Sequence, residues 1–329
     1  MQSGKGDNSI PVSSGILSQG KKMEYQSTLK KEITLKGIGL HSGETVNLRI
    51  RPASPGSGIS FRRTDLKPVV EIPARAENVV NTMLATVLGR GGATVSTVEH
   101  CMAALFAMGV DNAVVEVDGP ELPIMDGSAH PYVEAISRVG LKRQALPRRI
   151  IRIDKPIRIE DGDKFSILRP FEGFRITYSI DFDREAPGEK HFLMDVTPAN
   201  FAERLSMART FGFVAEVEML KKMGKAKGAT LENAVALHDG KVLNPEGLRM
   251  SDELVRHKML DAVGDLALAG AGIEGHLIVH KGGHELHRKL VTALLERPDA
   301  WSLVRPVKEK KRKLEVFGGF MPTPAAAHA

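Results

Sequence analysis

Three polar side chains of one segment have the residue types and the spacing of a metal-binding site. His257, Asp261 and Asp265 recur every four residues in the segment 251–270, and residues four apart lie on one face of a helix. A His and an Asp at that spacing can chelate one metal ion, by the same geometry as the two histidines of H-E-x-x-H. The alternative interpretation is an ordinary ion pair on a solvated helix face. Burial would favour the metal, because unpaired charge is costly inside a protein.

The segment itself is predicted to be an amphipathic helix. Ser251 or Asp252 is the predicted N-cap, and Gly270 is the predicted C-terminal stop. The apolar residues of the segment follow a helical period: Val255, Met259, Val263 and Leu266.

A second predicted helix, from Ser96 to Gly109, carries His100 and Glu99. Ser96 and Glu99 match a capping box, and Gly109 would end the helix. Glu99 therefore has two possible roles, as the carboxylate of that cap or as a general base beside a metal ligand. We interpret the neighbouring Cys101 as a core residue.

Each half of the chain is predicted to contain strands followed by a helix, a strand and a helix. Alternating apolar and polar residues predict antiparallel strands from Leu29 to Arg63. A linker is predicted at Ala145–Arg149, after which the strand pattern returns. The remaining predicted elements are Ala113–Val117, Pro131–Val139, Phe201–Ser206, Val214–Lys221, His276–His280 and Glu285–Glu296.

This order predicts an α+β fold of two domains with similar topology. The predicted ranges are a disordered extension (1–22), domain I (23–145), domain II (146–305) and a disordered basic tail (306–329). If the domains pack through their equivalent helices, His100 meets His257 and Asp261 between them, where binding sites usually form. Two His and one Asp with a fourth position for water is the composition of a catalytic zinc site.

A second group of histidines offers another candidate site. His280, His284 and His287 look like a metal cluster, but Gly282 and Gly283 place a turn after His280, which argues against a site on one helix. A carboxylate–imidazole pair of Asp265 and His284 would instead hold a protonated His as a general acid. A surface His at a helix start is the alternative for His284.

Three further residues have both a chemical and a structural interpretation. Thr210, beside Phe211 and before a predicted helix, could stabilise an oxyanion or cap that helix. Lys258 and Lys281 could bind phosphate or could be surface lysines.

Composition restricts the class of protein. The 329 residues are 42% hydrophobic and 26% charged, as in soluble globular proteins, and the single Cys excludes a disulfide framework. Without a membrane-length apolar run or a signal-peptide pattern, we expect a cytoplasmic protein. The net charge of +6 is concentrated in the C-terminal tail without interleaved aromatic residues, so we expect no nucleic-acid binding.

Seven motifs together resemble one enzyme family. They are G-I-G-L-H-S-G (37–43), S-T-V-E-H (96–100), P-I-M-D-G-S-A (123–129), R-T-F-G-F (209–213), V-L-N-P-E-G-L-R (242–249), V-R-H-K-M-L-D-A-V-G-D-L (255–266) and K-G-G-H (281–284). In order and spacing, from about Leu29 to Arg305, the chain resembles the zinc-dependent UDP-3-O-acyl-N-acetylglucosamine deacetylases of lipid A biosynthesis, the LpxC family. The extension and the tail fall outside this resemblance.

The resemblance implies a role for each matching residue. It implies Glu99 as general base, His284 paired with Asp265 as general acid, and Thr210 as the oxyanion stabiliser. It further implies one zinc ion bound by His100, His257 and Asp261, although Fe²⁺ would suit the same ligands. The implied substrate contacts are Lys258, Lys281, Asp181, Phe182 (stacking on uracil), Phe211 and Lys164.

The resemblance also implies a fold and a reaction. The fold would be two β-α-α-β sandwiches, each with an insert, and the second insert, within 214–244, would line a passage for the acyl chain. The reaction would be hydrolysis of the N-acetyl group of UDP-3-O-acyl-N-acetylglucosamine with release of acetate, the committed step of lipid A biosynthesis. We expect a monomer. Alternatives are an amidohydrolase acting on a different acylated sugar nucleotide, and a degenerate homologue that binds partners through its basic tail.

Overall fold

The computed structural model describes residues 25–182 and 186–305. The extension 1–22 and the tail 306–329, both predicted to be disordered, lie outside these residues. Within the described ranges, no helix combines the length and apolar character needed to cross a bilayer.

The first half of the chain supplies ten strands and two α-helices. In chain order they are β1 (Tyr25–Leu29), β2 (Ile33–Ile38), β3 (Thr45–Pro52), β4 (Ile59–Arg63), β5 (Val70–Pro73), the 3₁₀ turn η1 (Ala76–Asn78), β6 (Val79–Asn81), β7 (Val87–Arg90), β8 (Ala93–Val95), α1 (Glu99–Ala107), β9 (Ala113–Val117), α2 (His130–Val139) and β10 (Leu141–Pro147).

The second half continues with strands and then returns to helix, strand and helix. Its elements are β11 (Ile150–Ile153), β12 (Ile157–Asp161), β13 (Lys164–Arg169), β14 (Phe174–Ser179), β15 (His191–Asp195), α3 (Pro198–Asn200), the π-helical turn η2 (Phe201–Leu205), β16 (Phe211–Phe213), α4 (Val214–Lys222), β17 (Val235–His238), β18 (Lys241–Val242), α5 (Glu253–Leu266), η3 (Ala267–Ala269), β19 (Gly272–His280), α6 (His284–Glu296) and β20 (Trp301–Val304).

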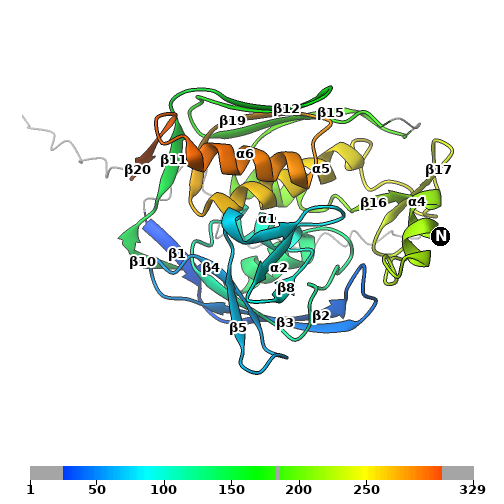
Figure 1. Cartoon of the computed structure of the whole chain (residues 1–329), viewed down its shortest axis with the longest axis horizontal. Helices are drawn as coiled ribbons and strands as arrows, with labels where there is room; N and C mark the ends of the chain where they lie inside the picture. Colours follow the sequence, from blue (N-terminus) through cyan, green and yellow to red (C-terminus); the bar gives the residue numbers. More distant parts are fainter. Residues whose placement is uncertain (1–24, 183–185, 306–329) are drawn as a thin grey trace, which may run out of the picture.

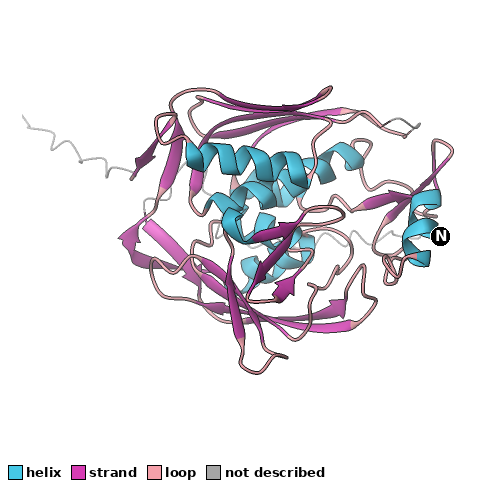
Figure 2. Ribbon diagram, viewed as in Figure 1, coloured by secondary structure: helices cyan, strands magenta, loops and turns pink. Residues whose placement is uncertain are grey.

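Two sheets form the outer layers of the molecule, and helices α1, α2, α5 and α6 lie between them (Figures 1 and 2). One sheet has the strand order β2-β3-β9-β4-β5, and the other is built around β19. In each sheet an internal strand follows one of the two helices that pack at the centre, β9 after α1 and β19 after α5: β9 pairs antiparallel with β3 and parallel with β4, and β19 pairs antiparallel with β13 and parallel with β14. The predicted α+β class and the matching element order of the halves are confirmed.

Three predicted features of individual elements are wrong. The N-cap of α1 is Val98, with no side-chain cap, so Ser96 and Glu99 do not form a capping box; the Ser96 hydroxyl donates to the Pro120 carbonyl instead. Residues 145–147 of the predicted linker belong to β10, because β1 supplies backbone partners from about 120 residues away. Strand β19 begins at Gly272, four residues early, because its first residues pair with β11.

Helices α1 and α5 pack against each other at the centre of the molecule (Figure 1). Their backbones approach most closely at Gly264, where a Cβ atom would lie 2.1 Å from the carbonyl oxygen of Glu99. A real Cβ cannot occupy that position, so the glycine allows the start of α1 to contact α5 directly.

We therefore expect Gly264→Ala to separate the two helices. Overpacking of this kind costs about 1–3 kcal/mol of the free energy of unfolding, which urea denaturation measures. Gly119→Ala is the matched control, since the added Cβ would meet only a side-chain methyl of Val46 at 3.7 Å. Equal stability of the two variants would show that the helices tolerate the extra methyl group.

Candidate metal centre

The structure brings His100, His257 and Asp261 together between α1 and α5. The Oδ1 atom of Asp261 lies 3.6 Å from Nε2 of His100 and 3.4 Å from Nε2 of His257. One ligand atom from each residue lies within 4.8 Å of the other two, and all three residues are buried. The ligand set predicted from the two helices is therefore assembled by the fold.

These distances fit a tetrahedral metal site better than a set of hydrogen bonds. Ligand atoms about 2.0–2.1 Å from a tetrahedral zinc ion lie roughly 3.3 Å apart, close to the observed gaps. Asp261 Oδ1 is buried and has no hydrogen-bond partner among the described residues. An unpaired buried carboxylate oxygen is costly, and a cation at this point would satisfy it.

His257 presents the nitrogen that a metal requires. Its Nδ1–H donates to the carbonyl of Ala208 at 3.0 Å, which fixes the tautomer and leaves the lone pair of Nε2 toward Asp261. Burial, opposed by the charge of Asp261, lowers the pKa of His257 to about 3. The imidazole is therefore neutral and able to act as a ligand.

A buried ion pair that the sequence analysis missed holds the Ala208 segment in place. Arg209 and Glu253 are both buried, with Arg209 Nε 2.8 Å from Glu253 Oε1. The same carboxylate accepts the backbone N–H groups of Arg209 and Arg249, and Arg209 also pairs with Glu246. Glu253 begins α5, so this cluster fixes the segment before β16 to the helix that carries His257.

We expect Glu253→Gln to destabilise the protein by about 3 kcal/mol, because it removes the buried counter-charge of a buried guanidinium and leaves only the half-exposed Glu246. Urea denaturation gives the change in the free energy of unfolding. Glu232→Gln is the control, since Glu232 is exposed. A loss below about 1 kcal/mol, the value of a surface pair, would contradict this role of the pair.

Glu99 points into the same region as the metal ligands. Its Oε2 accepts the backbone N–H of Thr86 at 3.0 Å, and its Oε1 lies 3.9 Å from Nε2 of His284. Burial raises the pKa of Glu99. The carboxylate is thus held inside the site, with one oxygen positioned toward His284.

Asp265 and His284 form the predicted carboxylate–imidazole pair. His284 Nδ1 and His287 Nδ1 lie 2.9 Å and 2.8 Å from the same oxygen of Asp265, and Thr86 Oγ1 donates to the other at 2.5 Å. Burial would lower the pKa of His284, but the charge and hydrogen bond of Asp265 outweigh it and raise this pKa to about 9. His284 is therefore protonated at neutral pH.

The alternative cluster of His280, His284 and His287, against which the turn at Gly282 and Gly283 argued, is not assembled. His284 and His287 approach Asp265 at hydrogen-bond distances rather than at the wider gaps seen around Asp261. His280 pairs instead with Ser179 Oγ at 2.8 Å and stacks on Phe165.

The two lysines with predicted substrate roles are paired with carboxylates. Lys258 Nζ lies 2.9 Å from Oδ2 of Asp261, beside the metal ligands. Lys281 Nζ lies 2.7 Å from Asp163 and 3.2 Å from Asp181. The sequence analysis missed Asp163, which the adjacent Lys164 at the start of β13 could have suggested.

Two aromatic residues predicted to contact the substrate, Phe182 and Phe211, lie between the Lys281 region and His257. The centre of the Phe182 ring lies 5.5 Å from that of Phe211, and the centre of the Phe211 ring lies 6.1 Å from that of His257.

Thr210 immediately precedes Phe211, and its backbone N–H donates to the carbonyl of Gly127. Helix α4 is capped at Phe213 without a side-chain bond, so Thr210 is not its cap. Lys164 is exposed.

The chain matches one family of enzymes and is similar to several of its members. The family model described as UDP-3-O-acyl N-acetylglycosamine deacetylase matches residues 26–296. Proteins named UDP-3-O-acyl-N-acetylglucosamine deacetylase are similar over most of their length. The protein of Geobacter sp. (strain M21) is 50% identical over 282 residues, 86% of this chain and 92% of its own. Those of Shewanella baltica (strain OS155) and Histophilus somni (strain 129Pt) are 49% and 48% identical, with 95% and 93% of their lengths covered.

Proposed function

Because this chain belongs to the UDP-3-O-acyl N-acetylglycosamine deacetylase family, we propose that it hydrolyses the N-acetyl group of UDP-3-O-acyl-N-acetylglucosamine in lipid A biosynthesis. The products are acetate and the free amine. One observation supports this reaction most strongly. His100, His257 and Asp261 are buried with their ligand atoms close together, and a carboxylate oxygen of Asp261 lies between the two imidazoles without a hydrogen-bond partner among the described residues.

We propose that these three residues hold one zinc ion, for which Fe²⁺ is the alternative. When bound, zinc lowers the pKa of a coordinated water and polarises a carbonyl oxygen. The neutral His257 and the ionised Asp261 have the charge states that metal ligands need. Burial opposes the ionisation of Asp261, but the positive charge of Lys258, whose Nζ lies 2.9 Å from Oδ2, helps to hold the pKa of this carboxyl well below its usual range.

Glu99 and His284 are the proposed base and acid of the hydrolysis. Glu99 accepts the proton of the attacking water, and His284 donates a proton to the departing glucosamine nitrogen. Oε1 of Glu99 and Nε2 of His284 are 3.9 Å apart, so both can face one scissile amide. Asp265 keeps His284 charged, and Thr210 is the proposed donor to the oxyanion of the tetrahedral intermediate.

The remaining predicted contacts are proposed to bind the rest of the substrate. Lys258 and Lys281 would contact the hexose and the diphosphate, and Asp181, Phe182, Phe211 and Lys164 would surround the nucleotide. Residues 214–244, which contain α4, β17 and β18 at the right of Figure 1, are the proposed passage for the acyl chain. Large apolar side chains of this segment are exposed: Met219, Met223, Leu231 and Leu243.

Three broader predictions stay proposals. We propose that residues 23–145 and 146–305 act as two domains, that the protein works as a monomer, and that it acts in the cytoplasm. The gathering of ligands from α1 in the first range and α5 in the second supports the division. Gel filtration with light scattering tests the monomer.

Metal removal distinguishes this function from its rivals. We expect acetate release from UDP-3-O-acyl-N-acetylglucosamine to stop with a strong chelator and to return with Zn²⁺. His257→Ala should lose the metal, measured by elemental analysis, and reduce kcat/KM by at least about 100-fold. His280→Ala is the control, because His280 lies outside the metal cluster.

Two outcomes of this experiment would contradict the proposed function. A metal-loaded protein that releases acetate only from another acylated sugar nucleotide would identify a different amidohydrolase. A folded protein without turnover on any of these substrates would identify a degenerate homologue.

A further inference from the structure

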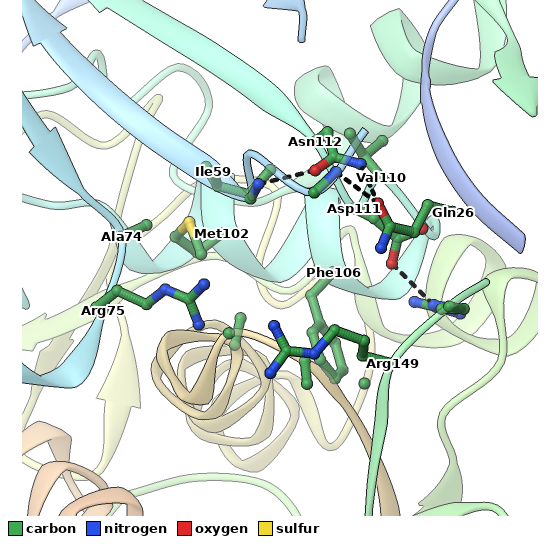
Figure 3. Close-up of a pocket in the computed structure, with 17 residues that line it drawn as sticks. Gln26, Ile59, Ala74, Arg75, Met102, Phe106, Val110, Asp111, Asn112 and Arg149 are labelled. Carbon is green, nitrogen blue, oxygen red and sulfur yellow. Dashed lines mark hydrogen bonds and ion pairs between the residues drawn. The ribbon is translucent and has the colours of Figure 1, made fainter. Parts of the chain in front are cut away.

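A cavity lies between the two halves of the chain, and its lining does not include His100, His257 or Asp261 (Figure 3). Its volume is about 70 Å³, room for a small molecule of several non-hydrogen atoms, since one water molecule needs about 10–15 Å³ on the same measure. Its walls come from the far half of α1, from the end of η3 and from the segment that joins β10 to β11. Nothing in the proposed deacetylation uses these residues.

Two arginines face each other across this cavity without an acidic partner. Figure 3 shows the guanidinium groups of Arg75 and Arg149 turned toward one another. Across the described residues, neither guanidinium forms an ion pair; the one hydrogen bond of Arg75 is a long contact of 3.5 Å to the Ala269 carbonyl. Two like charges that point at each other repel, and an anion between them would remove that repulsion.

The nearby acidic groups do not neutralise these arginines. Asp111 lines the cavity, but one of its oxygens accepts from Arg148 Nε at 2.9 Å and the other from the Ser27 backbone at 2.8 Å. Glu77 lines the adjoining hollow and is exposed, with no ion pair to Arg75 or Arg149 in the described parts of the chain. The positive charge of the pair is therefore uncompensated.

The lack of a side chain at Gly270 makes room for the guanidinium of Arg75. Gly270 has φ +74°, and a Cβ atom there would lie 1.4 Å from Nη1 of Arg75. The absence of a side chain at Gly270 thus leaves the space that the guanidinium fills. Such an arrangement holds the charged group at the cavity rather than in open solvent.

The other wall of the cavity is apolar. Met102 and Phe106 contribute from successive turns of α1, and Val110 follows the end of that helix. A ligand for this site therefore needs an anionic group for the arginines and a small apolar part for this wall.

We propose that this cavity is a binding site for a phosphate monoester with a small apolar group. Each guanidinium is a planar fork that can donate two hydrogen bonds. A phosphate monoester carries close to two negative charges at neutral pH and three acceptor oxygens, enough for both forks. A carboxylate has two oxygens and one charge, so it satisfies one fork.

The proposed site shares helix α1 with the candidate metal centre but no side chains. Met102 follows His100 by two positions on α1, which places the two side chains on different faces of the helix. Binding at the cavity is therefore separable from catalysis by mutation.

Isothermal titration calorimetry of the metal-loaded full chain tests the proposal with three probes: n-butyl phosphate, inorganic phosphate and butyrate. We expect n-butyl phosphate to bind most tightly, because it alone offers the phosphate and the apolar group. The double variant Arg75→Gln/Arg149→Gln should bind it at least about tenfold more weakly. Acetate release by this variant should equal that of the unchanged protein.

The controls separate this site from other sources of binding. Arg90→Gln removes the same charge from an exposed strand end and should leave the affinity unchanged. If the double variant does not fold, Arg149→Gln alone, at an exposed position, should still weaken binding. Equal affinity with and without the arginines, no binding of n-butyl phosphate, or butyrate binding as tightly as n-butyl phosphate would each overturn the proposal.

Discussion

Replacing Glu99 with glutamine is expected to leave the metal bound and to reduce kcat by about 10²- to 10⁴-fold, the usual contribution of a general base. The amide oxygen of glutamine can still accept the Thr86 N–H that Glu99 Oε2 accepts, so the local structure is retained. Only the capacity to take a proton is removed. Acetate release measures kcat, and elemental analysis measures the metal content.

Glu285→Gln is the matched control for this variant. It makes the same chemical change next to His284, but the Glu285 carboxylate binds Arg288 and Thr82 rather than facing the metal ligands. We expect its kcat to stay within a few-fold of the original. Normal turnover of Glu99→Gln would remove Glu99 as the base, and loss of metal from it would assign Glu99 a role in holding the ion.

The grouping of His100, His257 and Asp261 could be predicted because two patterns in the sequence point to it. His257 and Asp261 are four residues apart on a helix whose period is visible in the sequence, so their common face follows directly. His100 was added because the two halves repeat the order helix, strand, helix. The positions of the helices alone predict this meeting, and α1 packs on α5 accordingly.

Thr86 could not be predicted by this reasoning. It lies just before β7, and no motif or period marks it. Its backbone N–H meets Glu99 and its hydroxyl meets Asp265, 179 residues away in the chain. Contacts of that range depend on how two halves dock, which local patterns do not encode.

The capping box of α1 failed for a related reason. The motif Ser96–Glu99 is compatible with a local bond from the carboxylate back to the Ser96 amide. In the structure Glu99 is buried and its oxygen is already bound to Thr86. The packing of α1 against α5 thus rules out the capping role of Glu99, and its role as general base stays a proposal.

Asp265→Asn is expected to move the alkaline limit of activity toward lower pH. The pKa of His284 is about 9 because the charge and hydrogen bond of Asp265 outweigh the effect of burial. A raised pKa keeps the imidazole protonated up to about pH 9 and lets it lose its proton above that value. Without the carboxylate charge, the pKa should fall toward or below the ordinary value of about 6.5, so the acid form would disappear near neutral pH.

The pH dependence of kcat/KM for acetate release measures this limit. We expect the alkaline limb of the unchanged protein near pH 9, and that of Asp265→Asn at least about two pH units lower. Thr86→Val is the control, because it removes the hydroxyl bonded to Asp265 Oδ1 but keeps the carboxylate charge beside His284. An alkaline limb that Asp265→Asn does not move would show that a group other than His284 loses its proton there, and His284 would then no longer be the proposed acid.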